Sequence, residues 1–147
     1  MTVWVDYSGG ELDPNMLLRN NIGGAFRYGG TPGRTKNMQP GDVANALGAG
    51  LQQAVVYEDT ARDAEAGYAA GVAHANALLA DCARCKVPTT VPLAAAADEH
   101  LTAAQVTVAV QYQAGFYRTV KASGWSGPVG AYGFDEFIEA EIGRAQV

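Results

Sequence analysis

The sequence predicts an α/β fold, a (β/α) barrel-like parallel sheet of about five βα units. Short runs rich in β-branched and aromatic residues alternate five times with Ala-rich runs of helical spacing. Such alternation gives a parallel sheet with right-handed crossovers, either doubly wound or closed as a barrel. The chain has 147 residues, whereas a complete eight-unit TIM barrel needs at least about 200. We therefore expect an incomplete or truncated TIM barrel, or one whose missing strands belong to a longer parent protein.

The first three units run from the first strand to the longest helix. Strands are expected over residues 2–5, 24–28 and 53–57, and helices over residues 15–21, 42–47 and 63–82. Asp13 followed by Pro14 is a typical helix start, an N-cap and then a proline in the first turn. Asp42 is expected to cap the second helix. The third helix carries apolar residues at helical spacing, which predict a buried stripe: Tyr68, Val72, Ala75, Leu78 and Leu79.

The remaining units complete the alternation. A strand over residues 91–97 is apolar on both faces, as a buried parallel strand is. Thr102 is expected to cap a helix that ends near residue 123, and a fifth strand follows over residues 128–132. A last helix is expected over residues 134–142. Residues 1–147 thus form one domain, alone or as part of a longer parent protein.

The composition excludes several classes of protein. Hydrophobic residues make up 48% of the chain and charged residues 17%, a balance that excludes intrinsic disorder. No apolar run approaches the roughly 18–20 residues of a membrane span, and the sequence given opens without the features of a secretory signal. Because 15 acidic and 10 basic residues give a net charge of −5, nucleic acid is not an expected partner.

One C-x-x-C, formed by Cys82 and Cys85, is half of a four-cysteine zinc site, and the sequence has no second pair. The two thiols lie at the C-terminal end of the long helix, whereas a redox dithiol normally lies at a helix N-terminus. A structural or incidental role is favoured, with a metal or disulfide role as the alternative. His74 is expected to pack or lie at the surface, and His100 is the histidine nearest to the acidic residues described next. We expect no metal and no cofactor.

Acidic residues follow most of the predicted strands, where the active groups of parallel α/β folds lie. The first, third and fourth strands end in Asp6, Glu58-Asp59 and Asp98-Glu99, and Asp135-Glu136 follow the fifth. Carboxylates held close together raise one another's pKa, so that one can stay protonated while another is ionised. Glycosidic bond cleavage needs such a pair.

Helix capping is the alternative explanation for these acids. Asp59 and Asp135 fit a capping role, whereas Asp6 precedes a loop and is not explained by capping. Asp98 ends a wholly apolar strand, so we expect it to be desolvated. The candidate catalytic residues are therefore Asp6, Glu58 and Asp98.

Aromatic and charged neighbours of these acids are candidates for substrate binding. Tyrosines at strand ends can stack on sugar faces, with ordinary rim packing as the alternative, and Arg27 could neutralise one carboxylate of the cluster. The loop over residues 31–40 is expected to form a wall of the groove. The candidate substrate-binding residues are Arg27, Tyr28, Tyr57, Glu99 and Tyr132.

The ordered set of these motifs resembles a known family. Its segments are Val5-Asp6-Tyr7-Ser8-Gly9, Phe26-Arg27-Tyr28, Gly71-Val72-Ala73-His74-Ala75, Leu93 to Asp98, and Val129-Gly130-Ala131-Tyr132-Gly133. They resemble the glycoside-hydrolase-like domains of unknown function found in secreted proteins of actinobacteria and in cell-wall proteins of their phages. That family is distantly similar to the lysozyme-type muramidases. The resemblance covers nearly the whole chain.

The resemblance implies hydrolysis of bacterial cell-wall glycan (peptidoglycan) by paired carboxylates, with Asp98 as the acid and Asp6 or Glu58 as its charged partner. It also implies an extracellular or virion-associated, phage-encoded protein. Muramidases place two carboxylates two positions apart on the fourth strand, and here Ala96 takes the first position. The alternative is therefore a non-catalytic barrel module of a virion or cell wall, structural or saccharide-binding. A partner chain or domain is expected to cover the open sheet edges.

Overall fold

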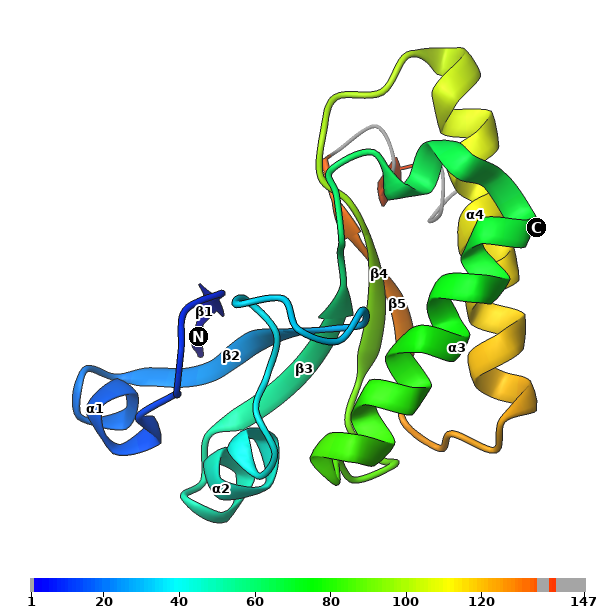
Figure 1. Ribbon diagram of the computed structural model, residues 1–147. Coiled ribbons are helices and arrows are strands. Elements are labelled where there is room, and N and C mark those ends of the chain that lie inside the picture. Colours follow the sequence, from blue (N-terminus) through cyan, green and yellow to red (C-terminus); the bar gives the residue numbers. More distant parts are fainter. Residues whose placement is uncertain (1, 135–137, 140–147) are drawn as a thin grey trace.

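The computed structural model describes residues 2–134, 138 and 139 and confirms the α/β class. Five parallel strands form one sheet in the order β1-β2-β3-β4-β5 (Figure 1). The strands are β1 (Val3–Tyr7), β2 (Ile22–Gly29), β3 (Gln52–Tyr57), β4 (Leu93–Ala97) and β5 (Val129–Gly133). A parallel sheet whose strand order follows the chain is the arrangement of a (β/α) barrel, here with five strands.

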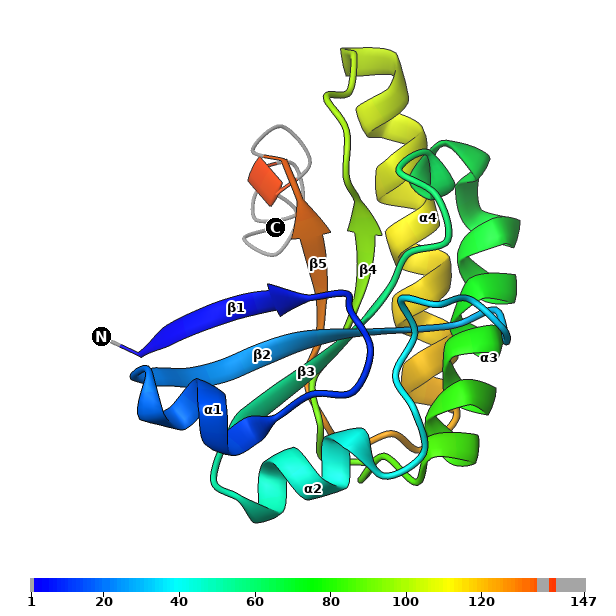
Figure 2. The same cartoon turned by 60° about the vertical axis from the view of Figure 1, so that its left-hand side comes forward.

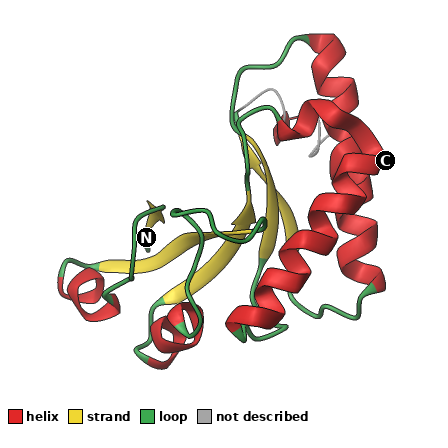
Figure 3. Ribbon diagram, viewed as in Figure 1, coloured by secondary structure: helices red, strands yellow, loops and turns green. Residues whose placement is uncertain are grey.

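Helices alternate with the strands and cover one face of the curved sheet (Figure 3). They are α1 (Pro14–Arg19), α2 (Asp42–Gly48), the 3₁₀ helix η1 (Asp63–Ala66), α3 (Gly67–Cys85) and α4 (Ala103–Ala122). The helix predicted over 63–82 therefore begins with a 3₁₀ turn and ends one turn later than expected. The predicted helix over 134–142 and its Asp135-Glu136 lie largely or wholly outside the described residues.

The two faces of the sheet have different partners because side chains alternate along each strand. On the outer face, Val55, Tyr57 and Leu93 pack against the helices α3 and α4. A second outer cluster joins Ala25 of β2 to Leu17 of α1 and other residues of this half of the sheet. The inner face carries the other parity and forms its own small cluster: Phe26, Tyr28, Val56, Ala94, Ala96 and Tyr132.

The helices α3 and α4 pack closely because glycines meet backbone at their crossing. A Cβ added at Gly71 would collide with the Tyr112 carbonyl, and one at Gly115 would collide with the Tyr68 carbonyl. The predicted buried stripe of α3 is confirmed for Ala75 and Leu78, which are buried, and wrong for Tyr68, which is 44% exposed. The backbone approach at the glycines, rather than large side chains, sets the distance between the two helices.

The capping predictions are confirmed for two residues and wrong for two. The Asp13 carboxylate accepts from the backbone of α1, and Thr102 forms a capping box at the start of α4. Gly41, not Asp42, is the N-cap of α2. Asp59 accepts from the Thr31 hydroxyl and pairs with an arginine of the loop, so it caps no helix.

No helix among residues 2–134, 138 and 139 is long and apolar enough to cross a membrane.

The strands β1 and β5 stand at the two ends of the strand order. In Figure 2 the carboxyl end of β1 points toward β5 across the concave side of the sheet. A hydrogen bond from Tyr132 on β5 to Asp6 on β1 spans this side. That a partner chain or domain covers the edges of the sheet at β1 and β5 stays a prediction.

Candidate functional site

The carboxylate of Asp6 is the centre of the candidate site. Its Oδ2 accepts from the Tyr28 hydroxyl at 2.7 Å and from the Tyr132 hydroxyl at 2.8 Å. Tyr28 lies on the neighbouring strand β2, whereas Tyr132 lies on β5 at the other end of the strand order. One carboxylate oxygen of β1 therefore receives one donor from the neighbouring strand and one from the strand at the far end of the strand order.

Aromatic rings form the floor beneath this carboxylate. The Phe26 ring lies 5.2 Å from the Trp4 ring and 5.6 Å from the Tyr132 ring, centroid to centroid. Such distances are those of attractive aromatic pairs. The floor is continuous from β1 through β2 to β5, so the inner face is filled by side chains at this level.

The phenols of the site stay protonated at neutral pH. Burial raises the pKa of Tyr132 to about 12, and its hydrogen bond to Asp6 and the Asp6 charge add to the effect. Burial and the same carboxylate also raise the pKa of Tyr28. Asp98 contributes to the raised pKa of Tyr132, which indicates that the Asp6 and Asp98 charges both lie near this phenol.

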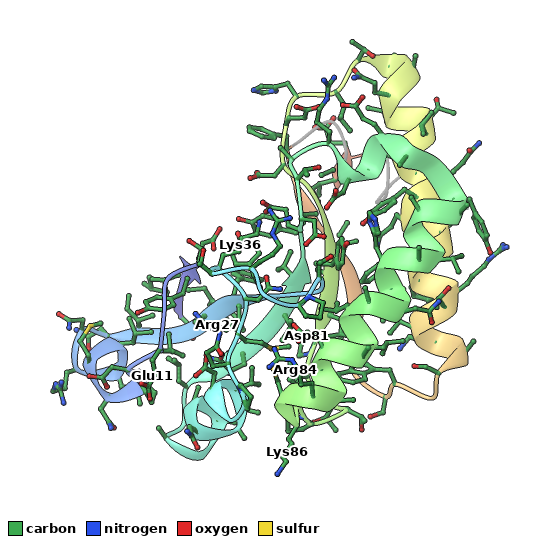
Figure 4. The ribbon with its side chains drawn as sticks, viewed as in Figure 1. Glu11, Arg27, Lys36, Asp81, Arg84 and Lys86 are labelled. Carbon is green, nitrogen blue, oxygen red and sulfur yellow. The ribbon has the colours of Figure 1, made fainter. Side chains whose placement is uncertain are left out.

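Glu58 continues the alternation of Ala54 and Val56 beyond the end of β3 and joins the site through Lys36. The Lys36 Nζ lies 2.6 Å from the Glu58 carboxylate and 4.7 Å from the centroid of the Tyr28 ring. Glu58 also contributes to the raised pKa of Tyr28. These contacts place Lys36, labelled in Figure 4, at the wall of the site.

The loop that carries Lys36 is held by backbone pairing. The Met38 N–H donates to the Tyr28 carbonyl at 2.7 Å, and Asn37 forms a parallel bridge with Tyr28. The Asn37 side chain donates to the Thr31 carbonyl at 2.9 Å. The loop over 31–40 therefore extends the sheet at its carboxyl end rather than hanging free.

Asp98 follows β4 and continues the alternation of Ala94 and Ala96 on the inner face. It borders a hollow of about 330 Å³ whose lining also includes Tyr132, Gly133 and Phe134. The desolvation predicted for Asp98 is wrong, because the residue is exposed. Burial ends with the last strand residue, Ala97, which is fully buried. Its catalytic role stays a prediction.

Arg27 does not join this site, so the prediction that it neutralises a site carboxylate is wrong. The side chain is fully buried on the outer face and pairs with Asp42 of α2 at 2.7 Å. It also donates to the carbonyls of Tyr7 and Gly10, each at 3.0 Å. Arg27 thus fastens β2 to α2 and to the loop after β1 (Figure 4).

Tyr57 also points away from the site. Its ring is 2% exposed and stacks on His74 of α3 at 4.4 Å. His74 in turn lies 3.1 Å from the Tyr112 hydroxyl, which confirms the packing role predicted for this histidine. A substrate-binding role for Tyr57 is therefore wrong.

Glu99 has the outer parity as well and pairs with Arg62 at 3.1 Å. The structure thus does not bring it to the inner face with Asp98. His100 lies beyond it, with its ring 4.3 Å from the Phe134 ring. Phe134 borders the same hollow as Asp98, so the histidine stands near the rim of the site.

The cysteines stand apart from this chemistry. Cys82 and Cys85 are buried free thiols, and burial raises the pKa of Cys85 to about 11 and that of Cys82 further. Among the described residues, no group of three His, Cys, Asp or Glu side chains could hold a metal ion. The thiols are thus protonated packing groups at neutral pH.

Sequence reasoning missed three residues that shape the site. Lys36 is a single cation in a loop, and no local pattern pairs it with Glu58. Trp4 and Phe26 have the same strand parity as Asp6 and Tyr28, and that parity was the signal that could have found them.

Comparison with known proteins agrees with the fold. The model of a family described as "Rv2525c-like, glycoside hydrolase-like domain" matches residues 15–146. None of the curated proteins matches the chain.

Solved structures share the architecture at low sequence identity. Crystal structures of the Tat-secreted Mycobacterium tuberculosis protein Rv2525c, with HEPES or L-tartrate, align with a TM-score of 0.78 and 23% identity. The alignment covers 95% of this chain and 72% or 71% of theirs. An uncharacterized B. stearothermophilus protein aligns with a TM-score of 0.69 and 18% identity, over 99% of this chain and 70% of its own.

The modular autolysin LytC of Streptococcus pneumoniae also aligns, with a TM-score of 0.66 and 11% identity. The alignment covers 92% of this chain and 33% of LytC. At these identities the similarity shows a common fold, and the chemistry must be argued from the site itself.

Proposed function

This chain belongs to the family of Rv2525c-like, glycoside hydrolase-like domains, and from this premise we propose that it hydrolyses bacterial cell-wall glycan. The proposal rests on one observation, which is that the polar residues named next share the inner face of the sheet. Asp6, Tyr28 and Tyr132 are joined on the inner face at the carboxyl ends of their strands. Glu58 and Asp98 follow β3 and β4 with the same parity. Active sites of (β/α) barrels lie at this end.

The surroundings of the carboxyl groups suggest how they divide the work. Asp6 accepts from two hydroxyls, and Glu58 pairs with Lys36. Both carboxyl groups therefore already have a polar side chain as partner. Asp98 has neither a cation nor a hydrogen-bond donor among the described residues. Asp98, the carboxyl group without such a partner, is the proposed acid, and Asp6 is its proposed charged partner. Glu58 is the third carboxyl group of the site.

The proposed reaction needs these two carboxyl groups and one water. Asp98 gives its proton to the glycosidic oxygen as the bond from that oxygen to the anomeric carbon breaks. The water oxygen bonds to the anomeric carbon, and the proton that this water loses passes to Asp6. Asp6 then releases that proton to solvent and Asp98 takes up a proton from solvent, so that both carboxyl groups return to their starting states. This hydrolysis requires no metal ion.

The hollow beside Asp98 is the proposed place of the saccharide. Tyr132 and Phe134 offer ring surface there, and apolar ring surface suits the faces of a sugar. Tyr28 is 5% exposed and is covered by Lys36, so its contribution is its hydroxyl rather than its ring. Rv2525c is a Tat-secreted protein, which supports activity of this chain outside the cell, and a virion is the alternative location.

One observation favours a second candidate function. Ala96 lies on the inner face, 1% exposed, at the strand position where muramidases carry the first of two carboxylates. A chain that lost this group could keep the barrel and bind saccharide without cleaving it. A saccharide-binding or structural module of a cell wall or virion is therefore the alternative.

The test is incubation of the wild-type protein with purified peptidoglycan, followed by measurement of reducing ends and of protein that sediments with the glycan. We expect reducing ends to accumulate with time and with protein concentration, and the heat-denatured protein to release none. Sedimentation without release would favour the binding module. If the protein neither sediments with the glycan nor releases reducing ends, both hydrolysis and saccharide binding are contradicted.

A further inference from the structure

The two tyrosine hydroxyls at Asp6 converge on a single oxygen atom. Tyr28 donates at 2.7 Å and Tyr132 at 2.8 Å, both to Oδ2. Among the described residues, the second oxygen, Oδ1, has no hydrogen-bond donor. A carboxylate held on one oxygen from two sides has a fixed plane and one oxygen left for another partner.

We propose that Tyr28 and Tyr132 are positioning residues that fix Asp6 through Oδ2 and leave Oδ1 as the oxygen that takes the proton of the attacking water. The inference rests on the proposed function and assigns the working atom of its charged partner. The hydrogen bond from Tyr132 also makes the site depend on the curvature of the sheet, because Tyr132 lies on β5 and Asp6 on β1.

The position of Tyr132 is set by its packing as well as by its hydroxyl. Its ring lies 5.6 Å from that of Phe26. The next residue, Gly133, has a φ of 150°, and a Cβ there would collide with the Ala97 carbonyl of β4. The end of β5 thus lies against β4 in a conformation that favours glycine. This contact presents the Tyr132 hydroxyl to Asp6.

The two tyrosine hydroxyls keep the protons with which they form hydrogen bonds to Asp6. Both phenols have raised pKa values, that of Tyr132 reaching about 12, so neither loses its proton in the range in which enzymes work. A hydrogen bond to a charged acceptor is worth about 1.5–3 kcal/mol, which corresponds to roughly 10- to 100-fold in a rate or a binding constant. Phenylalanine at either position removes this bond and keeps the ring.

The test compares Tyr132→Phe and Tyr28→Phe with Tyr117→Phe, a control on α4 whose tyrosine is 47% exposed. We expect kcat for glycan cleavage to fall by about 10- to 100-fold in the two site variants, with an altered pH profile and little change in KM. The control should match the wild type. A purely structural role for the hydroxyls would lower thermal stability and leave kcat and the pH profile of the folded protein unchanged, which would overturn the inference.

A second readout does not require activity. Tyrosine ionisation is followed by ultraviolet absorbance from pH 8 to 13, and the Tyr132 contribution is identified by its loss in Tyr132→Phe. In Asp6→Asn this contribution should move to lower pH, because the hydrogen bond and charge of Asp6 raise the pKa of Tyr132. An unchanged titration would overturn the inference even in an active enzyme. A shifted titration in a protein that neither binds nor cleaves glycan would overturn the proposed function and leave the fixed Asp6 in place.

Discussion

Replacing Asp98 with Asn is expected to lower the rate of reducing-end release from purified peptidoglycan by about 100- to 10,000-fold, the range lost with a general acid. Asparagine has nearly the shape of aspartate but no proton to donate to the leaving oxygen. Asp98 borders the hollow next to Tyr132 and is exposed, so the substitution should leave the fold intact. The rates are measured at equal protein concentration across pH 4 to 8.

Glu99→Gln is the matched control for this prediction. Glu99 is the neighbour of Asp98 in sequence but has the outer parity and pairs with Arg62. We expect Glu99→Gln to cleave at the wild-type rate. Equal loss in both variants would show that charge at this end of β4 matters in general, and equal rates in Asp98→Asn and the wild type would remove Asp98 from the mechanism.

Replacing Arg27 with Met is expected to lower the free energy of unfolding by about 3–5 kcal/mol, the usual cost of breaking a buried ion pair. The Arg27 side chain is fully buried and that of Asp42 is 6% exposed, with 2.7 Å between the paired atoms. Methionine removes the guanidinium and leaves the Asp42 carboxylate without its cation. It also frees the carbonyls of Tyr7 and Gly10. Urea denaturation measures the change.

Two variants test the cause of this loss. Arg62→Met removes a cation whose side chain is 68% exposed, and its unfolding free energy should stay close to that of the wild type. In Arg27→Met/Asp42→Asn the stranded charge is gone, so part of the lost stability should return. A loss of the same size in Arg62→Met, or no recovery in the double variant, would contradict a buried charge as the cause.

The strands could be predicted because their pattern is local. Each predicted strand overlaps an observed one, and the alternation of strands with helices sufficed to predict parallel pairing. The strand order followed only from the choice of the barrel over the doubly wound sheet. The α1 and α4 caps followed from single residues, Asp13 and Thr102. Helix ends could be predicted less well. The helix α3 extends to Cys85 and ends where Lys86 adopts a left-handed conformation, and no local sequence pattern predicts this conformation.

The site could be predicted only to within one residue along each strand. Residues 27 and 28 both end β2, yet Tyr28 faces the inner side and Arg27 the helices. The same step separates Tyr57 from Glu58 and Glu99 from Asp98. Because a shift of one residue exchanges the faces of a strand, the end of a strand predicts the site only together with its register.

Long-range partners account for the other differences. Asp42 and Asp59 have the local pattern of helix caps, but Arg27 and the loop residues Thr31 and Arg34 bind their carboxylates instead. Nothing near these acids in sequence indicates those partners. Asp98 differs for another reason, since the burial of β4 ends at Ala97 and desolvation does not extend past the strand.

The proposed function requires saccharide to bind the inner face of the sheet at the carboxyl ends of the strands. Titration of isotopically labelled Asp98→Asn with a soluble peptidoglycan fragment, followed by NMR, tests it directly, because binding is observed without turnover. We predict that the chemical-shift changes concentrate around Asp6, Tyr132 and Asn at position 98. Changes concentrated at the opposite end of the sheet, around Gln52 and Thr90, or the absence of any change at millimolar fragment, would contradict the account.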